Sequence, residues 1–81
     1  PFNPITTLRY DLPEQAFVAL TIYDMLGREI VQLVKTTQEA GFKLVQWDGS
    51  DIMGRPVSAG VYLYQIRAGE FVQTRKMVLL K

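Results

Sequence analysis

Cysteine and histidine are both absent from this chain of 81 residues. Without cysteine, neither a disulfide framework nor a thiolate metal site can form. Without histidine, the chain lacks the commonest general base and the commonest metal ligand in proteins. A serine in a nucleophile-elbow motif is missing as well. We therefore expect a non-catalytic domain with no cofactor and no bound metal.

Long hydrophobic runs and a strong net charge are also lacking. No apolar run approaches the ~20 residues that a membrane-spanning helix needs. The formal net charge is +1, which gives no electrostatic reason to expect a nucleic-acid partner. There is no N-terminal signal peptide, and the chain begins with Pro1 rather than methionine. We interpret it as a segment of a longer exported protein.

The length and composition are those of one small domain. Apolar residues make up 48% of the chain, and a domain of this size buries roughly 60–65% of its unfolded surface. That is enough for one compact core but not for a large substrate cavity. Pro1 and Pro4 favour an extended backbone, so we expect residues 1–5 to be a linker and residues 6–81 to be the domain.

The hydrophobic pattern has a period of two, which is typical of β-strands. Strands are expected at residues 7–12, 18–23, 29–35, 42–47, 61–67 and 71–80, with a weak further strand at 56–58. The only place for a helical turn is residues 37–40. Short strands with turns roughly every ten residues predict an all-β fold, an antiparallel β-sandwich of about seven strands. Trp47, Tyr62 and Tyr64 are the expected large core residues.

Two turns share the pattern Asp-x-x-Gly-Arg, at residues 24–28 and 51–55. Asp24 and Asp51 begin these turns, where an aspartate side chain accepts backbone N–H bonds. Gly27 and Gly54 supply the left-handed conformation that closes such a reversal. Residues 68–70 predict another tight turn. We interpret the pair as one turn chemistry used twice, not as a sequence repeat.

The segment from Asp48 through Gly49 to Asp51 is the one acidic cluster that resembles a ligand loop. A helix-flanked calcium loop needs oxygen ligands at alternate positions and a distal glutamate. Neither is present, so we expect a turn in which Asp48 and Asp51 cap backbone N–H groups.

A carbohydrate-binding role is an alternative, because sugars stack on exposed aromatic rings. Phe17 and Tyr23 fall on the strand face opposite Val18, Leu20 and Ile22, so both rings are expected to point outward. The corresponding hypothesis is a non-catalytic binding or spacer module attached to a secreted enzyme.

The last segment is an apolar run between cations: Thr74, Arg75, Lys76, Met77, Val78, Leu79, Leu80 and Lys81. Its parity is ambiguous, because both faces become apolar over the final positions. One interpretation is a core strand whose cations protect a sheet edge from aggregation. The other is a docking stripe for another protein.

Several short motifs, in order along the chain, resemble one family of bacterial domains. They are residues 1–4 with Thr6 and Thr7, residues 22–24 leading to 26–28, residues 47–49, Gly60-Val61-Tyr62 with Tyr64, and residues 76–81. Together they resemble the type A C-terminal sorting domain of the Por (type IX) secretion system.

This resemblance implies an immunoglobulin-like sandwich that directs a fused upstream cargo protein through the outer membrane. The implied partners are an outer-membrane translocon or shuttle protein and a sortase-like protease. The implied location is the periplasm in transit, then the cell surface or the medium of a Gram-negative bacterium. Recognition would rest on residues 74–81, with Gly60, Val61 and Tyr62 as the neighbouring strand motif.

The chain also resembles the immunoglobulin-like domain of flagellar hook-capping proteins. That domain shares the Trp-Asp-Gly turn and the Gly-x-Tyr strand, here Trp47-Asp48-Gly49 and Gly60-Val61-Tyr62. It implies a structural assembly module, which remains a second alternative to the sorting role.

Overall fold

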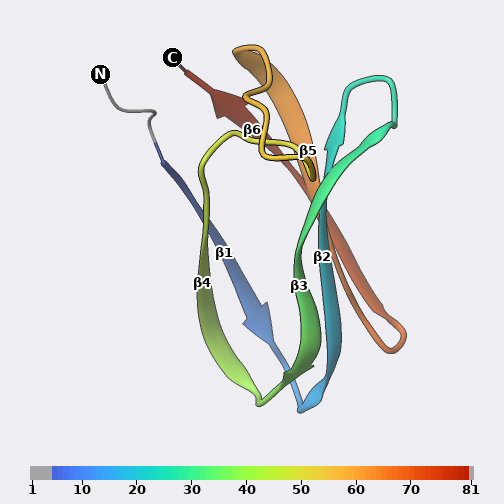
Figure 1. Ribbon diagram of the computed structural model, residues 1–81. Helices are drawn as coiled ribbons and strands as arrows, with labels where there is room; N and C mark the ends of the chain where they lie inside the picture. Colours follow the sequence, from blue (N-terminus) through green and yellow to red (C-terminus); the bar gives the residue numbers. More distant parts are fainter. Residues whose placement is uncertain (1–4, 81) are drawn as a thin grey trace.

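The computed structural model describes residues 5–80, which form two antiparallel sheets packed face to face (Figure 1). The larger sheet has the strand order β3-β2-β5-β6 and the smaller one pairs β1 with β4. The strands are β1 (Thr6–Leu12), β2 (Ala16–Asp24), β3 (Glu29–Gln38), β4 (Gly41–Trp47), β5 (Gly60–Ala68) and β6 (Phe71–Leu79). The expected antiparallel sandwich is confirmed. Residues 1–4 of the linker expected at 1–5, and the residue Lys81, lie outside the described part.

The expected strand count is wrong. The described residues contain six strands instead of about seven, because Pro56 makes only an isolated bridge with Ser50. A proline has no N–H to donate to a ladder, which disfavours a strand at 56–58. Residues 37–40, the one place where the sequence left room for a helical turn, contain the end of β3, where Thr37 pairs with Phe17.

Alternation along the strands places one face of each sheet in the core, as expected. Trp47, Tyr62 and Tyr64 are all buried, so their expected role as large core residues is confirmed. The remaining buried hydrophobic residues come from both sheets: Leu8, Tyr10, Leu12, Val18, Leu20, Ile22, Ile66, Ala68 and Leu79.

Two tyrosine hydroxyls join the sheets across the core. The hydroxyl of Tyr64 on β5 donates to the carbonyl oxygen of Arg9 on β1 at 3.2 Å. The hydroxyl of Tyr10 on β1 donates to Oε1 of Gln38 on β3. Burial raises the pKa of the Tyr10 phenol, which keeps it neutral and able to donate. Because each buried hydroxyl has an acceptor, aromatic residues fill the core without leaving a costly unpaired polar group.

The outer strand β3 contains two bulges. The register against β2 shifts between Leu20 and Thr21 and again between Ile22 and Tyr23. Ile30 and Leu33 are the extra residues on β3, and the carbonyl of Ile30 accepts a bond from Ile52 N at 3.2 Å. Bulges increase local twist and interrupt the ladder. Here one of them also attaches the long β4–β5 connection to the sheet.

The structure settles the parity of β6. Leu79 points into the core and is 1% exposed, whereas Val78 and Val72 lie on the outer face. Gly49, with φ of 78°, lies directly against Leu79, because a Cβ built there would be 3.2 Å from Leu79 Cδ2. The last strand is therefore part of the core packing.

We expect Leu79→Ala to destabilise the domain strongly, by about 2–5 kcal/mol, because it removes buried methyl groups and leaves a cavity. The neighbouring Val78→Ala is the matched control. It should change stability by less than about 0.5 kcal/mol, since the side chain is on the surface. Urea denaturation followed by circular dichroism measures both. Equal losses in the two variants would contradict the assigned parity.

Candidate functional site

The structure brings together the two segments that the sequence singles out for recognition. Gly60, Val61 and Tyr62 at the start of β5 pair with Leu79, Val78 and Met77 at the end of β6. Thr74, Arg75 and Lys76 lie in the middle of β6 and pair with residues 63–65. The two segments thus lie side by side on β5 and β6, at one edge of the larger sheet.

The outer surface of this end carries an apolar patch. We call Val61, Val78 and Leu80 the Val78 patch; all three are exposed, and Val61 and Val78 are directly paired across the strands. Lys76 is exposed two residues before Val78, on the same outer face. No acidic residue occurs between Val72 and Leu80. An apolar patch rimmed by one sign of charge is typical of a protein-docking surface.

The backbone beside this patch is also available. β6 has β5 as its single sheet neighbour, so its outer edge is unpaired within the part of the chain that the structure describes. All nine β5–β6 pairs, from Gly60–Leu79 to Ala68–Phe71, follow one continuous register. A regular open edge can accept an additional strand through main-chain hydrogen bonds.

Trp47 holds in place the loop whose Gly49 lies against Leu79 at the end of β6. Its Nε1 donates to the carbonyl oxygen of Ser50 at 2.9 Å. Its ring meets that of Tyr62 edge to face, with centroids 5.3 Å apart and an interplanar angle of 73°. The Tyr62 hydroxyl donates to the carbonyl oxygen of Ser58 at 2.6 Å. The loop after β4 is thereby fixed against the start of β5, and Gly49 of that loop supports Leu79.

The two Asp-x-x-Gly-Arg turns have the same hydrogen-bond pattern, as predicted. Oδ1 of Asp24 accepts from the backbone N–H of Leu26 and of Arg28, each at 2.9 Å. Oδ1 of Asp51 accepts from the N–H of Met53 and of Arg55 at the same distance. Gly27 and Gly54 have φ of 85° and 80°, so the left-handed conformation predicted for both is confirmed.

The aspartates of these turns are stabilised as anions. Backbone N–H donation from Arg28 holds the pKa of Asp24 below its usual value, and Arg55 has the same effect on the pKa of Asp51. The arginine side chains add to this, since Nε of Arg28 lies 2.7 Å from Asp24 Oδ2 and Nε of Arg55 lies 3.3 Å from Asp51 Oδ2. Each carboxylate is engaged within its own turn.

The sequence reasoning missed the side chains at the tips of these turns. Met25, Leu26, Ile52 and Met53 are 57%, 80%, 74% and 73% exposed. We call these four residues the twin-turn patch. The sequence does contain a signal for this exposed apolar surface, because both turns place two large apolar residues between Asp and Gly, where a turn tolerates most residues. An interpretation of the turns as purely structural does not use that signal.

The acidic loop after β4 acts as a cap. Oδ1 of Asp48 accepts hydrogen bonds from the backbone N and the Oγ of Ser50, and these bonds lower the pKa of Asp48. Asp51 caps the next turn, so the predicted capping roles of both aspartates are confirmed. Within residues 5–80 no group of three or more potential ligands is placed to hold a metal ion.

Phe17 and Tyr23 lie on the same outer face of β2, as expected, but not side by side. Phe17 is exposed, whereas Tyr23 is partly covered and is paired with Leu63 of β5. They are six positions apart along the strand, which is roughly 20 Å. That distance is too long for the two rings to stack on neighbouring sugar units, so the structure does not assemble the proposed carbohydrate platform.

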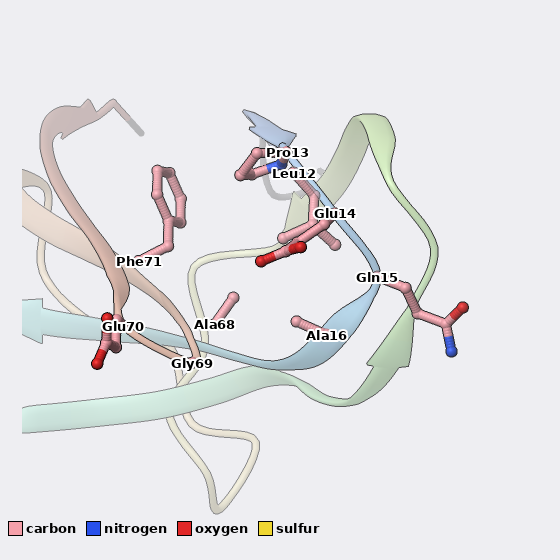
Figure 2. A pocket seen from close by; sticks show the side chains of 9 residues that line it. All are labelled: Leu12, Pro13, Glu14, Gln15, Ala16, Ala68, Gly69, Glu70 and Phe71. Carbon is pink, nitrogen blue, oxygen red and sulfur yellow. The ribbon is translucent and has the colours of Figure 1, made fainter.

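A hollow of about 430 Å³ lies at the other end of the sandwich, between the β1–β2 and β5–β6 reversals (Figure 2). Its apolar lining comes from Leu12, Ala16, Ala68 and Phe71. In Figure 2 the carboxylate of Glu14 extends toward this hollow, whereas the side chains of Gln15 and Glu70 point away. Sequence reasoning did not identify the hollow, because it joins residues more than fifty positions apart.

A smaller hollow of about 370 Å³ lies beside the start of β3, between Val31, Leu33 and Trp47. The described residues contain no helix long and apolar enough to cross a membrane.

The turn aspartates predict a loss of stability in acid. Their folded-state pKa values lie below the ordinary value of 3.8, so their contribution is complete above that value and is lost as the pH falls through the folded-state pKa. We expect the unfolding free energy of the wild type to decrease below about pH 4. The decrease should be smaller in an Asp24→Asn/Asp51→Asn variant.

Urea titrations between about pH 2 and pH 6, the range in which carboxyl groups titrate, measure this difference. Asp11→Asn, which changes an exposed carboxyl on β1 without altering a turn, is the control. Identical pH dependence in the wild type and the double variant would show that the turn carboxylates do not stabilise the fold.

The chain was compared with known protein families and solved structures. The model of the FlgD Ig-like domain family matches residues 4–71. A crystal structure of FlgD from P. aeruginosa superposes with a TM-score of 0.76 at 22% sequence identity, over 94% of this chain. The present chain spans 60% of that FlgD chain. No curated protein matches the sequence.

The structural likeness shows a shared immunoglobulin-like fold, and the family match covers most of the domain through the start of β6. The matching model is that of the FlgD domain, not of a sorting domain. The Trp-Asp-Gly turn and the Gly-x-Tyr strand lie inside the matched range. This chain therefore belongs to the FlgD Ig-like domain family.

Proposed function

We propose that this domain is a non-catalytic assembly module of the hook-cap type, which docks a longer protein onto a larger protein complex. The observation that carries the proposal is the Val78 patch beside the open edge of β6, in a chain of the FlgD Ig-like family. The sequence resemblance to the immunoglobulin-like domain of hook-capping proteins supports the same role.

The arrangement of side chains favours docking over catalysis. Catalysis needs a nucleophile or a base positioned beside a cavity. In the described residues the two hollows are lined mainly by apolar side chains and carry no histidine or cysteine. An exposed apolar patch next to an unpaired strand edge provides instead the two components of strand-addition binding, main-chain hydrogen bonds and side-chain contacts.

A role as a type IX sorting label is a second candidate, supported by one specific observation. The family match ends at Phe71, whereas Val78 and Leu80 of the Val78 patch and the cations Arg75 and Lys76 follow it. This segment carries the sequence resemblance to the sorting domains. In that role an outer-membrane translocon or shuttle protein would bind the Val78 patch, and the cargo would be exported from the periplasm.

A substitution at the patch tests docking without removing the core contact of Leu79. We expect Val78→Ser with Leu80→Ser to weaken docking by about tenfold or more, as truncation of central interface residues does. The matched control is Val72→Ser with Leu44→Ser, which removes the same side-chain types from other exposed sites. Thermal unfolding of each purified variant establishes that the fold is retained.

The measurement is made on the full-length parent protein in its own host. The fraction recovered in the cross-linked assembly and the fraction exported from the cell are determined in parallel. Loss of assembly with normal export supports the hook-cap role, and loss of export supports the sorting role. If the patch variant behaves like its control in both assays, the Val78 patch is not the docking surface.

A further inference from the structure

The open edge of β6 carries two adjacent cations, Arg75 and Lys76, which we call the cation pair. Both side chains are exposed, and none of residues 71–81 is acidic. Because consecutive strand residues point to opposite faces of a sheet, the two cations lie on opposite sides of the edge. Lys76 lies on the outer face with Val78, and Arg75 lies on the inner face with Met77.

The charge of the cation pair is not balanced by a contacting carboxylate. Within residues 5–80 both ion pairs belong to the two Asp-x-x-Gly-Arg turns, so neither Arg75 nor Lys76 takes part in one. With its amide turned to accept, Gln73 receives hydrogen bonds from Nη2 of Arg75 at 3.0 Å and from Nε at 3.3 Å. This neutral amide orients the guanidinium group but leaves its charge uncompensated.

The nearby carboxylates of the chain are distant, turned away or already engaged. Glu29 lies in the same cross-strand row as the lysine of the cation pair but three strands away, about 14 Å. Glu14 and Glu70 lie at the hollow of Figure 2, and Glu70 is five positions before the arginine, roughly 17 Å along the strand. Asp24 is two strands away and is ion-paired within its own turn. Asp11 of β1 points away from β6, because the residues on either side of it are the buried ones.

A strand added to this edge would place its side chains opposite those of β6. Directly opposed side chains in an antiparallel pair have Cβ atoms about 5 Å apart, so a carboxylate there meets a cation. We propose that the β6 edge selects a strand of another protein that carries two consecutive acidic residues, one opposite Arg75 on the inner face and one opposite Lys76 on the outer face. This inference rests on the proposed docking function and specifies the partner of that same surface.

The residues that follow the cation pair extend the sequence that fits. Val78 is exposed on the outer face, and Met77 is partly buried against the core on the inner face, so the partner residues opposite them are apolar. In the other direction Thr74 and Gln73 are polar. All strand pairs of residues 5–80 are antiparallel. In that orientation the partner strand contains, from its N-terminal side, two apolar, two acidic and two polar residues.

The cation pair also disfavours a second copy of this chain at the edge. Two β6 strands paired antiparallel about their centre place Arg75 of each copy opposite Lys76 of the other. Like charges directly opposite each other destabilise a sheet, and cations on an edge strand protect it from self-association. The occupant we infer is therefore a different, acidic strand.

Short fluorescent peptides test the two acidic positions on the 81-residue chain itself. The probe Val-Val-Glu-Glu-Thr-Thr-Val presents one glutamate to each cation. Its isomer Val-Glu-Val-Glu-Thr-Thr-Val has the same composition, but both glutamates lie on one face, so only one can meet a cation. Anisotropy titrations should show binding of the isomer weakened by about tenfold or more, and amide shifts caused by the probe should be largest along β6. Equal affinities, or shifts centred elsewhere, would overturn the proposal.

Reversal of a single charge tests the register. Lys76→Glu should weaken binding of the first probe, and Val-Val-Lys-Glu-Thr-Thr-Val should recover it, because the lysine of that peptide lies opposite position 76. Val-Val-Glu-Lys-Thr-Thr-Val should not recover it, since its lysine lies opposite Arg75. Equal recovery by both peptides would indicate attraction without strand register and would count against the proposal.

A matched control separates local from overall charge. Arg75→Glu/Lys76→Glu should weaken binding of the first probe by about tenfold or more. Arg9→Glu/Lys35→Glu also reverses one arginine and one lysine, at exposed positions on β1 and β3, and should bind like the wild type. Equal losses in the two variants would show that net charge alone matters. Thermal unfolding checks that each variant is folded, and the comparison of the two peptide isomers needs no variant.

The result can be distinguished from that of the docking experiment. Impaired assembly or export in the Val78→Ser/Leu80→Ser variant, together with equal affinities for the two peptide isomers, would leave the docking function in place and remove only the acidic specificity. No effect of that variant in cells would instead overturn the docking function, whatever the peptides bind.

Discussion

The rest of the structure depends on how a two-stranded sheet covers a four-stranded one. Buried positions of the larger sheet are concentrated on the central strands β2 and β5, whereas β3 has none and β6 has Leu79 alone. Large side chains fill the space between the two layers. Trp47 and Tyr10 supply this bulk from the smaller sheet, and Tyr62 and Tyr64 supply it from the larger one. The hydroxyl or N–H group of each of these four side chains donates to an acceptor, so the large rings fill the core without leaving an unpaired donor there.

The same constraint gives β6 its double character. Its inward face is only partly covered along the strand, and Leu79, supported by Gly49, is the residue that anchors it firmly. Val78 and Leu80, on either side of Leu79 in the sequence, remain on the surface. Core packing and surface exposure therefore alternate residue by residue at the end of β6, and only individual substitutions can separate them.

Much of the fold could be predicted from the sequence, because a period of two and the Asp-x-x-Gly-Arg turns are local signals. Strand faces such as Leu8, Tyr10 and Leu12 followed directly from alternation. The parity of the last strand did not, since both of its faces are apolar and only the contact with Gly49 distinguishes them. The hollow near Glu14 was also beyond prediction, because it exists only once two distant reversals lie together. The twin-turn patch was predictable in principle, from four apolar residues in turns that do not require them.

The two bulges in β3 have a consequence for growth of the larger sheet. The bulges make the outer strand β3 a poor template for another strand, because they make the spacing of its N–H and C=O groups irregular. The opposite outer strand, β6, keeps one unbroken register over its full length. The two outer edges of the sheet therefore differ: β6 offers an incoming strand regularly spaced backbone groups, and β3 does not. The regular edge of β6 is therefore the more favourable of the two for adding a strand.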